Sequence, residues 1–184
     1  MRIVGGRFRG RALAALGKGD PAARLRPTSD RVREAVFNMV EHRYGLAGRR
    51  VLDLFAGTGA LGLEALSRGA AEAVFVENGA AGGALIRKNL ATLGIIDTAR
   101  LMRGDATRLG PAKSTFDLVF ADPPYGQGLG QAALGAARDG GWLASDAVFV
   151  LEEGGEVPLP SGFRIDETRR YGDTVVTMGR VGPE

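Results

Sequence analysis

The amino-acid sequence has no cysteine and only one histidine in 184 residues. Without thiols it can form no disulfide, no thiolate zinc cluster and no thiol nucleophile, so its chemistry must come from carboxylates, hydroxyls, the backbone or a cofactor. Long hydrophobic runs are also missing, since no apolar stretch approaches the roughly 20 residues of a membrane span, and the first residues lack the apolar region of a secretion signal. We therefore expect a cytoplasmic protein with no membrane partner and no metal.

Charge is divided unevenly along the chain. Residues 1–50 carry 12 Lys and Arg against four acids, a net charge of +8, whereas the remainder has a net charge of −5, which together give the overall +3. This asymmetry favours a basic arm that meets a polyanion and an acidic body with another task. A solvated arginine-rich end with no partner is the alternative at this point.

The first 27 residues predict a small extension of one domain. Residues 2–4 and 11–13 are short, half-apolar segments separated by glycines, a pattern typical of a β-hairpin, and Arg7, Arg9 and Arg11 would lie near its turn. Residues 17–27 predict a loop. We expect residues 28–184 to form the main domain.

A helix is predicted directly after this extension. Thr28 or Ser29 can cap it, and an apolar stripe at helical spacing continues to Gly45. Arg31 and Arg33 are interpreted as lying off that stripe, where they would be available to a polyanion.

From residue 50 onward, buried strands alternate with helices. Strands are expected at 51–55, 73–77, 99–102, 116–120 and 148–151, helices at 60–69, 80–93 and 128–138, and an antiparallel pair at 163–167 and 174–181. This alternation indicates an α/β fold with a mostly parallel sheet and helices on both faces.

A glycine-rich turn follows the first of these strands. It contains Asp53, Phe55, Gly57 and Gly59 and leads into a helix, whose first backbone N–H groups are free to meet a carboxylate or phosphate. Nicotinamide-binding proteins show the same glycine spacing, so this turn alone does not identify the ligand.

Further acids follow the other strands. Glu77 ends the second strand, where a carboxylate can accept hydrogen bonds from ribose hydroxyls, and Asp105 and Ala106 follow the third strand, where an acid can meet the amino group of an adenine. Since parallel strands present their carboxyl ends at one edge, we expect Asp53, Glu77, Asp105 and Asp122 to gather there.

The order of these motifs resembles that of class I S-adenosylmethionine-dependent methyltransferases over about residues 48 to 181. The resemblance implies a Rossmann-like fold with a seven-stranded sheet and a C-terminal antiparallel hairpin. It also implies S-adenosyl-L-methionine as cofactor and S-adenosyl-L-homocysteine as product. The residues that it assigns to the cofactor are Asp53, Phe55, Gly57, Gly59, Glu77, Asp105 and Ala106.

The most specific motif is Asp122-Pro123-Pro124-Tyr125, after the fourth strand. Two prolines stiffen the backbone, so the Asp122 carboxylate and a proline carbonyl can act as fixed acceptors for the two hydrogens of an exocyclic amine. Tyr125 can stack on the base. The motif resembles the signature of enzymes that methylate amino groups of bases, which implies catalytic roles for Asp122, Pro123 and Tyr125.

The N-terminal segments decide the substrate by resemblance. The stretches 1–11 and 25–38, the latter containing Arg-Pro-Thr-Ser-Asp-Arg-Val-Arg-Glu, resemble the RsmD family of bacterial 16S rRNA guanine-N2 methyltransferases. Membership implies transfer to guanine 966, in rRNA numbering, within the small ribosomal subunit or an assembly intermediate, by an enzyme that we expect to be a monomer. The residues that it implies for RNA binding are Arg7, Arg9, Arg11, Arg26, Thr28, Arg31 and Arg33.

Three other functions compete with this interpretation. An adenine-N6 methyltransferase acting on DNA or RNA would use the same motif, although DNA enzymes usually carry a separate recognition region. A nicotinamide oxidoreductase would explain the glycines but not Asp122 to Tyr125. A non-catalytic RNA-binding protein would not need the intact acids.

Overall fold

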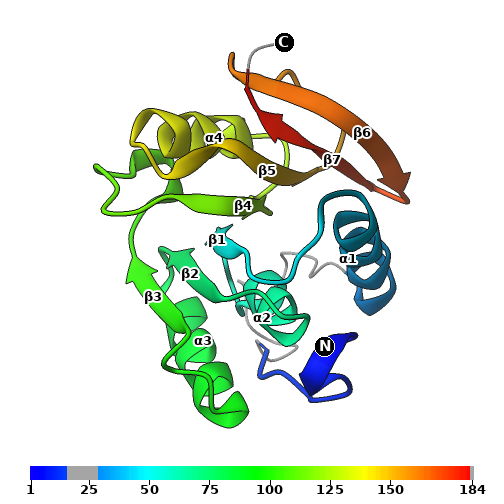
Figure 1. Ribbon diagram of the computed structural model, residues 1–184, viewed down its shortest axis with the longest axis vertical. Coiled ribbons are helices and arrows are strands. Elements are labelled where there is room, and N and C mark those ends of the chain that lie inside the picture. Colours follow the sequence, from blue (N-terminus) through cyan, green and yellow to red (C-terminus); the bar gives the residue numbers. More distant parts are fainter. Residues whose placement is uncertain (16–28, 183–184) are drawn as a thin grey trace.

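A computed structural model describes residues 1–15 and 29–182 and contains one seven-stranded sheet with the order β3-β2-β1-β4-β5-β7-β6 (Figure 1). Its five parallel strands are β1 (Arg50–Leu54), β2 (Glu72–Glu77), β3 (Ala99–Arg103), β4 (Phe116–Ala121) and β5 (Leu143–Glu153). β1 lies at the centre of the five parallel strands, where Val51 pairs with Ala73 of β2 and with Leu118 of β4. The strands that follow β1 in the sequence lie first on one side of it (β2 and β3) and then on the other (β4 and β5). Open α/β sheets bind their ligands at such a switch point.

Two apolar clusters cover the two faces of the sheet. On one face, α1 (Asp30–Tyr44), α2 (Ala60–Ser67) and α3 (Ala80–Leu93) pack in a cluster that includes Phe37, Phe75 and Phe120. On the other face lies α4 (Leu129–Asp139), whose Ala133 and Leu134 pack against Val119. The predicted α/β fold with helices on both faces is confirmed.

The carboxyl-terminal part closes the sheet with two antiparallel strands, β6 (Phe163–Tyr171) and β7 (Thr174–Val181). β7 lies between β5 and β6, as Figure 1 shows at the top right. The predicted terminal pair is confirmed. Both β5 and β6 are longer than the sequence pattern indicated, because their outer halves carry polar residues that obscure the apolar signal.

The N-terminal segment (residues 1–15) forms the predicted antiparallel hairpin, but its arms are too short to be strands. A bridge between Arg2 and Ala12 and backbone hydrogen bonds from Ile3 to Arg11, from Gly10 to Ile3 and from Leu13 to Met1 join the arms, and the connection contains a short 3-10 helix, η1 (Gly6–Phe8). Arms of three residues provide too few ladder hydrogen bonds to form strands alone. The segment instead lies on α2, with Ile3 fully buried in the core.

Candidate active site

Four acids lie at or directly after the carboxyl ends of four neighbouring strands, and three of them share one face of the sheet. Side chains alternate between faces along a strand, and Asp53 and Glu77 continue the rows of Val51 and Phe75, which belong to the cluster under α1, α2 and α3. By the same alternation, Glu152 continues the row of Val150 on β5, and Asp122 directly follows β4, between β1 and β5. The resulting order across the sheet is Glu77, Asp53, Asp122, Glu152.

Asp53 is a buried acid on β1 that contacts the start of α2. It is 1% exposed, and its Oδ2 accepts a hydrogen bond from the backbone N–H of Gly62 at 2.8 Å, which holds the first turn of α2 against β1. Burial raises the pKa of Asp53 from 3.8 to about 7, the Gly62 hydrogen bond opposes this rise, and the charges of Glu77 and Glu152 add to it. The carboxylate therefore fixes the start of α2, which directly follows the glycine loop (residues 55–59).

Glu77 braces the glycine loop from the neighbouring strand. Its Oε2 accepts a hydrogen bond from Gly57 N–H at 2.7 Å, and its Oε1 accepts one from Gly79 N–H at 2.5 Å. The side chain is thereby fixed beside the loop at the end of β2. In this position a carboxylate can accept hydrogen bonds from vicinal hydroxyls of a ribose.

Two features of the backbone allow this close arrangement. A Cβ at Gly82 would lie 2.8 Å from Glu77 Cδ and 2.9 Å from the Gly57 carbonyl oxygen, so only glycine fits there. This explains the glycine-rich start of α3, which is unusual for a helix. Phe55 is the only non-glycine among the described residues with a positive φ, 59°, a strained conformation that often marks a functional turn.

Asp105 lies beyond β3 and caps the short 3-10 helix η3 (Ala106–Arg108). Its Oδ1 accepts hydrogen bonds from Thr107 N–H at 2.9 Å and from Thr107 Oγ1 at 2.7 Å. These two bonds hold the pKa of Asp105 below its ordinary value, so the group is ionised at neutral pH. Ala106 behind it is buried.

The Asp122-Pro123-Pro124-Tyr125 motif is held by β5, α4 and β7. Pro123 is buried and packs beside Gly130, where a Cβ would come within 3.2 Å of the proline ring. The Tyr125 hydroxyl lies 3.1 Å from Thr174 Oγ1 at the start of β7. Glu153 Oε2 accepts a hydrogen bond from Gly126 N–H at 3.1 Å and so holds the turn after the tyrosine.

Tyr125 stays a neutral phenol at physiological pH. Burial raises its pKa to about 12, and the charges of Asp122, Glu152 and Glu153 act in the same direction, whereas the hydrogen bond with Thr174 opposes the rise. The side chain is still 37% exposed, so its ring is accessible. It is suited to stacking on a planar ligand and not to accepting a proton.

Glu152 is a buried acid beside the Asp122 motif that the sequence interpretation missed. It is 1% exposed, on the strand beside Asp122, one residue beyond the register pair Ala121 and Leu151. The predicted strand ended at residue 151, which left the glutamates in a loop. The alternation from Val148 and Val150 was the available signal, since it places Glu152 on the same face as Asp53 and Glu77.

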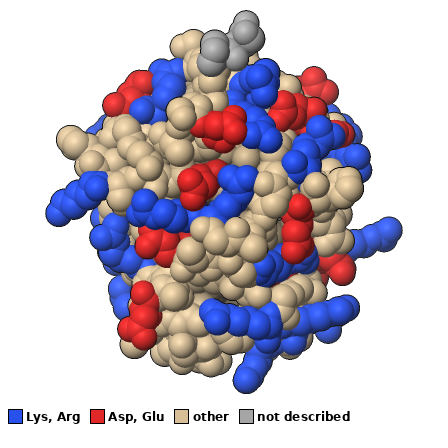
Figure 2. All heavy atoms as spheres, in the orientation of Figure 1, with Lys and Arg blue, Asp and Glu red and all other residues tan. Residues whose placement is uncertain are grey.

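Four of the predicted RNA-binding arginines lie on the surface. Arg7, Arg9, Arg11 and Arg31 are exposed, and a cavity of about 380 Å³ between the N-terminal segment and α1 is lined by Arg2, Arg9, Arg31 and also Asp30 and Glu34. Figure 2 shows Lys and Arg side chains projecting from the lower part of the molecule, where Figure 1 places the N-terminal segment. Arg26 and Thr28 lie outside the described residues.

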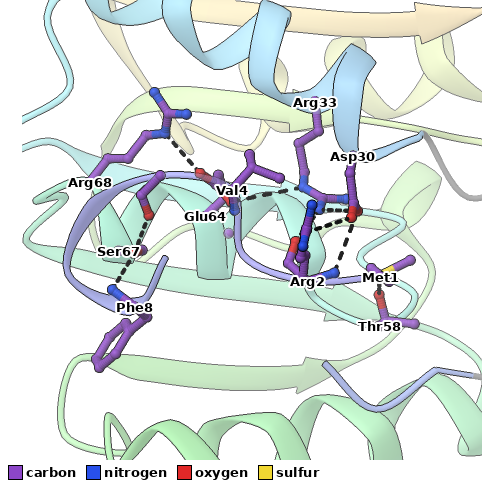
Figure 3. Close-up of polar contacts among 12 residues, drawn as sticks. Met1, Arg2, Val4, Phe8, Asp30, Arg33, Thr58, Glu64, Ser67 and Arg68 are labelled. Atoms are coloured by element: carbon purple, nitrogen blue, oxygen red, sulfur yellow. Dashed lines mark hydrogen bonds and ion pairs between the residues drawn. The ribbon is translucent and has the colours of Figure 1, made fainter. Parts of the chain in front are cut away.

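Arg33 is in a different place from the one predicted. It is 1% exposed, and its guanidinium contacts Asp30 Oδ1 at 2.8 Å, Glu64 Oε2 at 3.9 Å and the carbonyl oxygen of Arg2 (Figure 3). An arginine enclosed by two carboxylates is not available to a phosphate. Its function in this structure is to join α1 to α2 and to the N-terminal segment.

Within residues 1–15 and 29–182, no cluster of three or more histidine or acidic side chains is arranged to hold a metal ion. None of the helices in these ranges has the length and apolar character needed to cross a membrane.

Comparison with known proteins identifies the family. A family model described as conserved hypothetical protein 95 matches residues 1–180. The chain belongs to this family. Among its curated relatives is the ribosomal RNA small subunit methyltransferase D of Escherichia coli K12, which is 41% identical over 162 residues, 88% of this chain and 78% of the relative. The protein of that name from Haemophilus influenzae is 34% identical and covers 86% of this chain and 81% of its own.

Solved structures confirm the class I methyltransferase fold. The Escherichia coli protein yhhF aligns with a TM-score of 0.83 and 36% identity over 100% of this chain and 99% of that chain. The Thermus thermophilus 16S rRNA N2 G1207 methyltransferase RsmC, solved with AdoMet and guanosine, aligns with a TM-score of 0.63 at 24% identity over 85% of this chain and 44% of its own. At this identity, the similarity to RsmC supports the fold alone.

Proposed function

We propose that this protein transfers a methyl group from S-adenosyl-L-methionine to the exocyclic N2 of a guanine in 16S rRNA, guanine 966 in rRNA numbering. One observation carries the proposal: Asp122 and the two prolines after it follow β4 between the glycine loop on β1 and Glu152 on β5. Family members named as small-subunit rRNA methyltransferases support the choice of RNA.

The donor fits the residues around the glycine loop. Glu77 would receive the ribose hydroxyls, and the exposed Asp105 beside η3 would accept from the adenine amino group, with the backbone of Ala106 next to it. The loop from Phe55 to Gly59 would lie along the methionine part, and Asp53 holds the start of α2 that follows this loop. When bound, the cofactor supplies an electrophilic methyl group, and S-adenosyl-L-homocysteine remains after transfer.

Asp122 and the Pro123 carbonyl would hold the acceptor amine. Fixing both N–H bonds would aim the nitrogen lone pair at the methyl group that the bound cofactor supplies. The proton that the amine gives up would pass to the Asp122 carboxylate or to water. Attack by nitrogen needs no covalent enzyme intermediate, which agrees with a chain that has no cysteine.

The position of Glu152 supports guanine over adenine. The Watson–Crick edge of guanine presents N–H donors at both N1 and N2, whereas adenine presents a donor at N6 and an acceptor at N1. A second carboxylate beside Asp122 can accept from guanine N1–H, but it would face the N1 lone pair of adenine. A site with buried polar groups strongly rejects a base that would leave those groups unpaired, and it therefore discriminates between guanine and adenine. N6 methylation of adenine in DNA or RNA is therefore the weaker candidate.

The N-terminal segment and the start of α1 would hold the RNA backbone. Arg7, Arg9, Arg11 and Arg31 are exposed on this side, and the cavity beside Arg9 and Arg31 would receive a phosphodiester, with Asp30 and Glu34 also in its lining. The target guanine would leave its stack to reach Tyr125. We propose that a monomer acts on the small ribosomal subunit or an assembly intermediate.

A transfer assay tests this function. Small ribosomal subunits from cells that lack the modification are incubated with the protein and methyl-labelled S-adenosylmethionine, and label in 16S rRNA is measured. The native protein should label the RNA, and Asp122→Ala should abolish transfer while it binds the cofactor with little change. Loss of cofactor binding in that variant would show that our division of roles is wrong, and no labelling by the native protein would refute the function.

A further inference from the structure

The side-chain amide of Asn89 on α3 contacts two segments that are far apart in the sequence. Its Oδ1 accepts a hydrogen bond from Ala14 N–H at 2.7 Å, and its Nδ2 donates to the Ala14 carbonyl at 3.2 Å and to the Thr58 carbonyl at 3.0 Å. Asn89 is 1% exposed. One buried amide therefore joins the N-terminal segment to the middle of the glycine loop.

A second contact links the same two segments. The hydroxyl of Thr58 lies 3.3 Å from the sulfur of Met1, which Figure 3 shows at the start of the N-terminal segment. The glycine loop at Thr58 is thus approached from both ends of that segment, by Met1 directly and by Ala14 through Asn89. Between these ends the segment carries the exposed Arg7, Arg9 and Arg11.

We infer that Asn89 is a positioning residue that couples the N-terminal segment to the glycine loop. Through this coupling, RNA and S-adenosylmethionine would strengthen each other's binding. The inference rests on the proposed function and adds a link between its two binding sites. RNA that orders the N-terminal segment keeps Ala14 on Asn89, which keeps the amide aimed at Thr58. The loop then presents its donor-binding conformation more of the time.

The chemistry of the amide explains how movement of the N-terminal segment reaches the glycine loop. If Ala14 moves away, Asn89 loses two of its three hydrogen bonds in a buried site, where unpaired polar groups are unfavourable. The amide is then free to turn and to leave the Thr58 carbonyl. Thermodynamic linkage requires the reverse effect to be equally large, so the donor must also favour the docked N-terminal segment.

Calorimetric titration with S-adenosylmethionine, with and without a 16S rRNA transcript, measures the coupling. In the native protein we expect the transcript to tighten donor binding by about 5-fold or more, within the usual range for coupled sites. Asn89→Leu keeps the branched shape of the side chain but removes all three hydrogen bonds, and the ratio of the two dissociation constants should fall close to one. A ratio in Asn89→Leu equal to that of the native protein would overturn the inference.

Ser67→Ala is the matched control. Ser67 Oγ donates to the Gly5 carbonyl at 2.6 Å and accepts from Phe8 N–H at 3.0 Å, so its loss also loosens the N-terminal segment, but these contacts are not with the glycine loop. A purely structural role would give both variants the same loss of coupling. We expect Ser67→Ala to retain most of it, and an equal loss in both variants would contradict the specific role of Asn89.

Hydrogen exchange in the native protein tests the link even if Asn89→Leu does not fold. Saturating S-adenosylmethionine should slow exchange of the Ala14 amide, which lies outside the proposed donor contacts. Donor binding that leaves exchange at Ala14 unchanged would refute the coupling. If the donor does not bind, the proposed function fails, and the titration itself reveals that outcome separately.

Discussion

The carboxylate of Glu77 accepts a hydrogen bond from the backbone N–H of Gly57, with 2.7 Å between Oε2 and nitrogen. The acid proposed to bind the ribose therefore also fixes the glycine loop beside it. Donor binding should be sensitive to any change that moves this side chain, including changes that leave Glu77 itself intact.

Gly82→Ala should weaken donor binding by roughly 10-fold or more, about 1.4 kcal/mol. The added Cβ would lie 2.8 Å from Glu77 Cδ and 2.9 Å from the Gly57 oxygen, so the carboxylate and the loop must separate. Calorimetric titration with S-adenosylmethionine measures this change.

Gly135→Ala on α4 is the control for this substitution. A Cβ at Gly135 would meet no described atom within 4 Å, so the alanine should raise the free energy of unfolding by about 0.5 to 1 kcal/mol through helix propensity alone. Donor affinity should not change. Equal affinities in the Gly82 and Gly135 variants would show that the contact between Gly82 and Glu77 has no bearing on the donor.

Asp53→Asn should change how stability depends on pH. The pKa of Asp53 is raised from 3.8 to about 7 by burial, so the folded protein favours the protonated acid. Its contribution to stability is full below about pH 4 and is lost as the pH rises through 7, by a total on the order of 4 kcal/mol.

Denaturant unfolding of the ligand-free protein from pH 4 to pH 8 measures this contribution. The stability of the native protein relative to Asp53→Asn should fall steadily over that range. A difference that stays constant with pH would mean that Asp53 titrates at its ordinary value.

Glu64→Ala should destabilise the fold by about 3 to 5 kcal/mol. Glu64 is fully buried, and its carboxylate accepts from Val4 N–H at 2.8 Å and from Arg68 Nε at 2.8 Å beside Arg33 (Figure 3). Removing it leaves the buried guanidinium of Arg33 without one of its two carboxylates. Thermal and denaturant unfolding measure the loss.

Glu72→Ala is the control that tests whether the loss of stability in Glu64→Ala comes from the burial of its ion pairs. Glu72 pairs with Arg50 at 2.6 Å, but both side chains are more than one third exposed. An exposed pair contributes about 1 kcal/mol or less, and this variant should unfold nearly as the native protein does. Similar losses in the Glu64 and Glu72 variants would contradict the importance of the buried network.

Replacing Arg7, Arg9 and Arg11 with glutamine should reduce the salt dependence of RNA binding. Each lost phosphate contact should lower the slope of log affinity against log salt concentration by about 0.7 on single-stranded RNA. Filter binding of a 16S rRNA transcript at several salt concentrations gives the slope. An unchanged slope would remove these three arginines from the proposed RNA surface.

The sheet and its acids were largely predictable from the sequence. Buried parallel strands appear as continuous apolar runs, and the glycine turn, Glu77 and Asp122 each follow such a run. The N-terminal segment was not predictable in the same way. Its shape depends on Glu64, Ser67 and Asn89, which are about 60 to 75 residues away in the chain.

The prediction for Arg33 was wrong because its charge was given more weight than its helical spacing. It precedes Val36 by three residues and Phe37 by four, so helical spacing places it on the buried face of α1. Its charge suggested the solvated face instead. The spacing alone could not show that Glu64 of α2 and the backbone of the N-terminal segment would meet the guanidinium there.

Nucleoside analysis of methylated 16S rRNA tests the central claim most directly. Small ribosomal subunits from unmodified cells are treated with the protein and labelled S-adenosylmethionine, and the RNA is digested to nucleosides and separated by chromatography. Our account predicts label in N2-methylguanosine at a single position of the RNA. Label in N6-methyladenosine would contradict it.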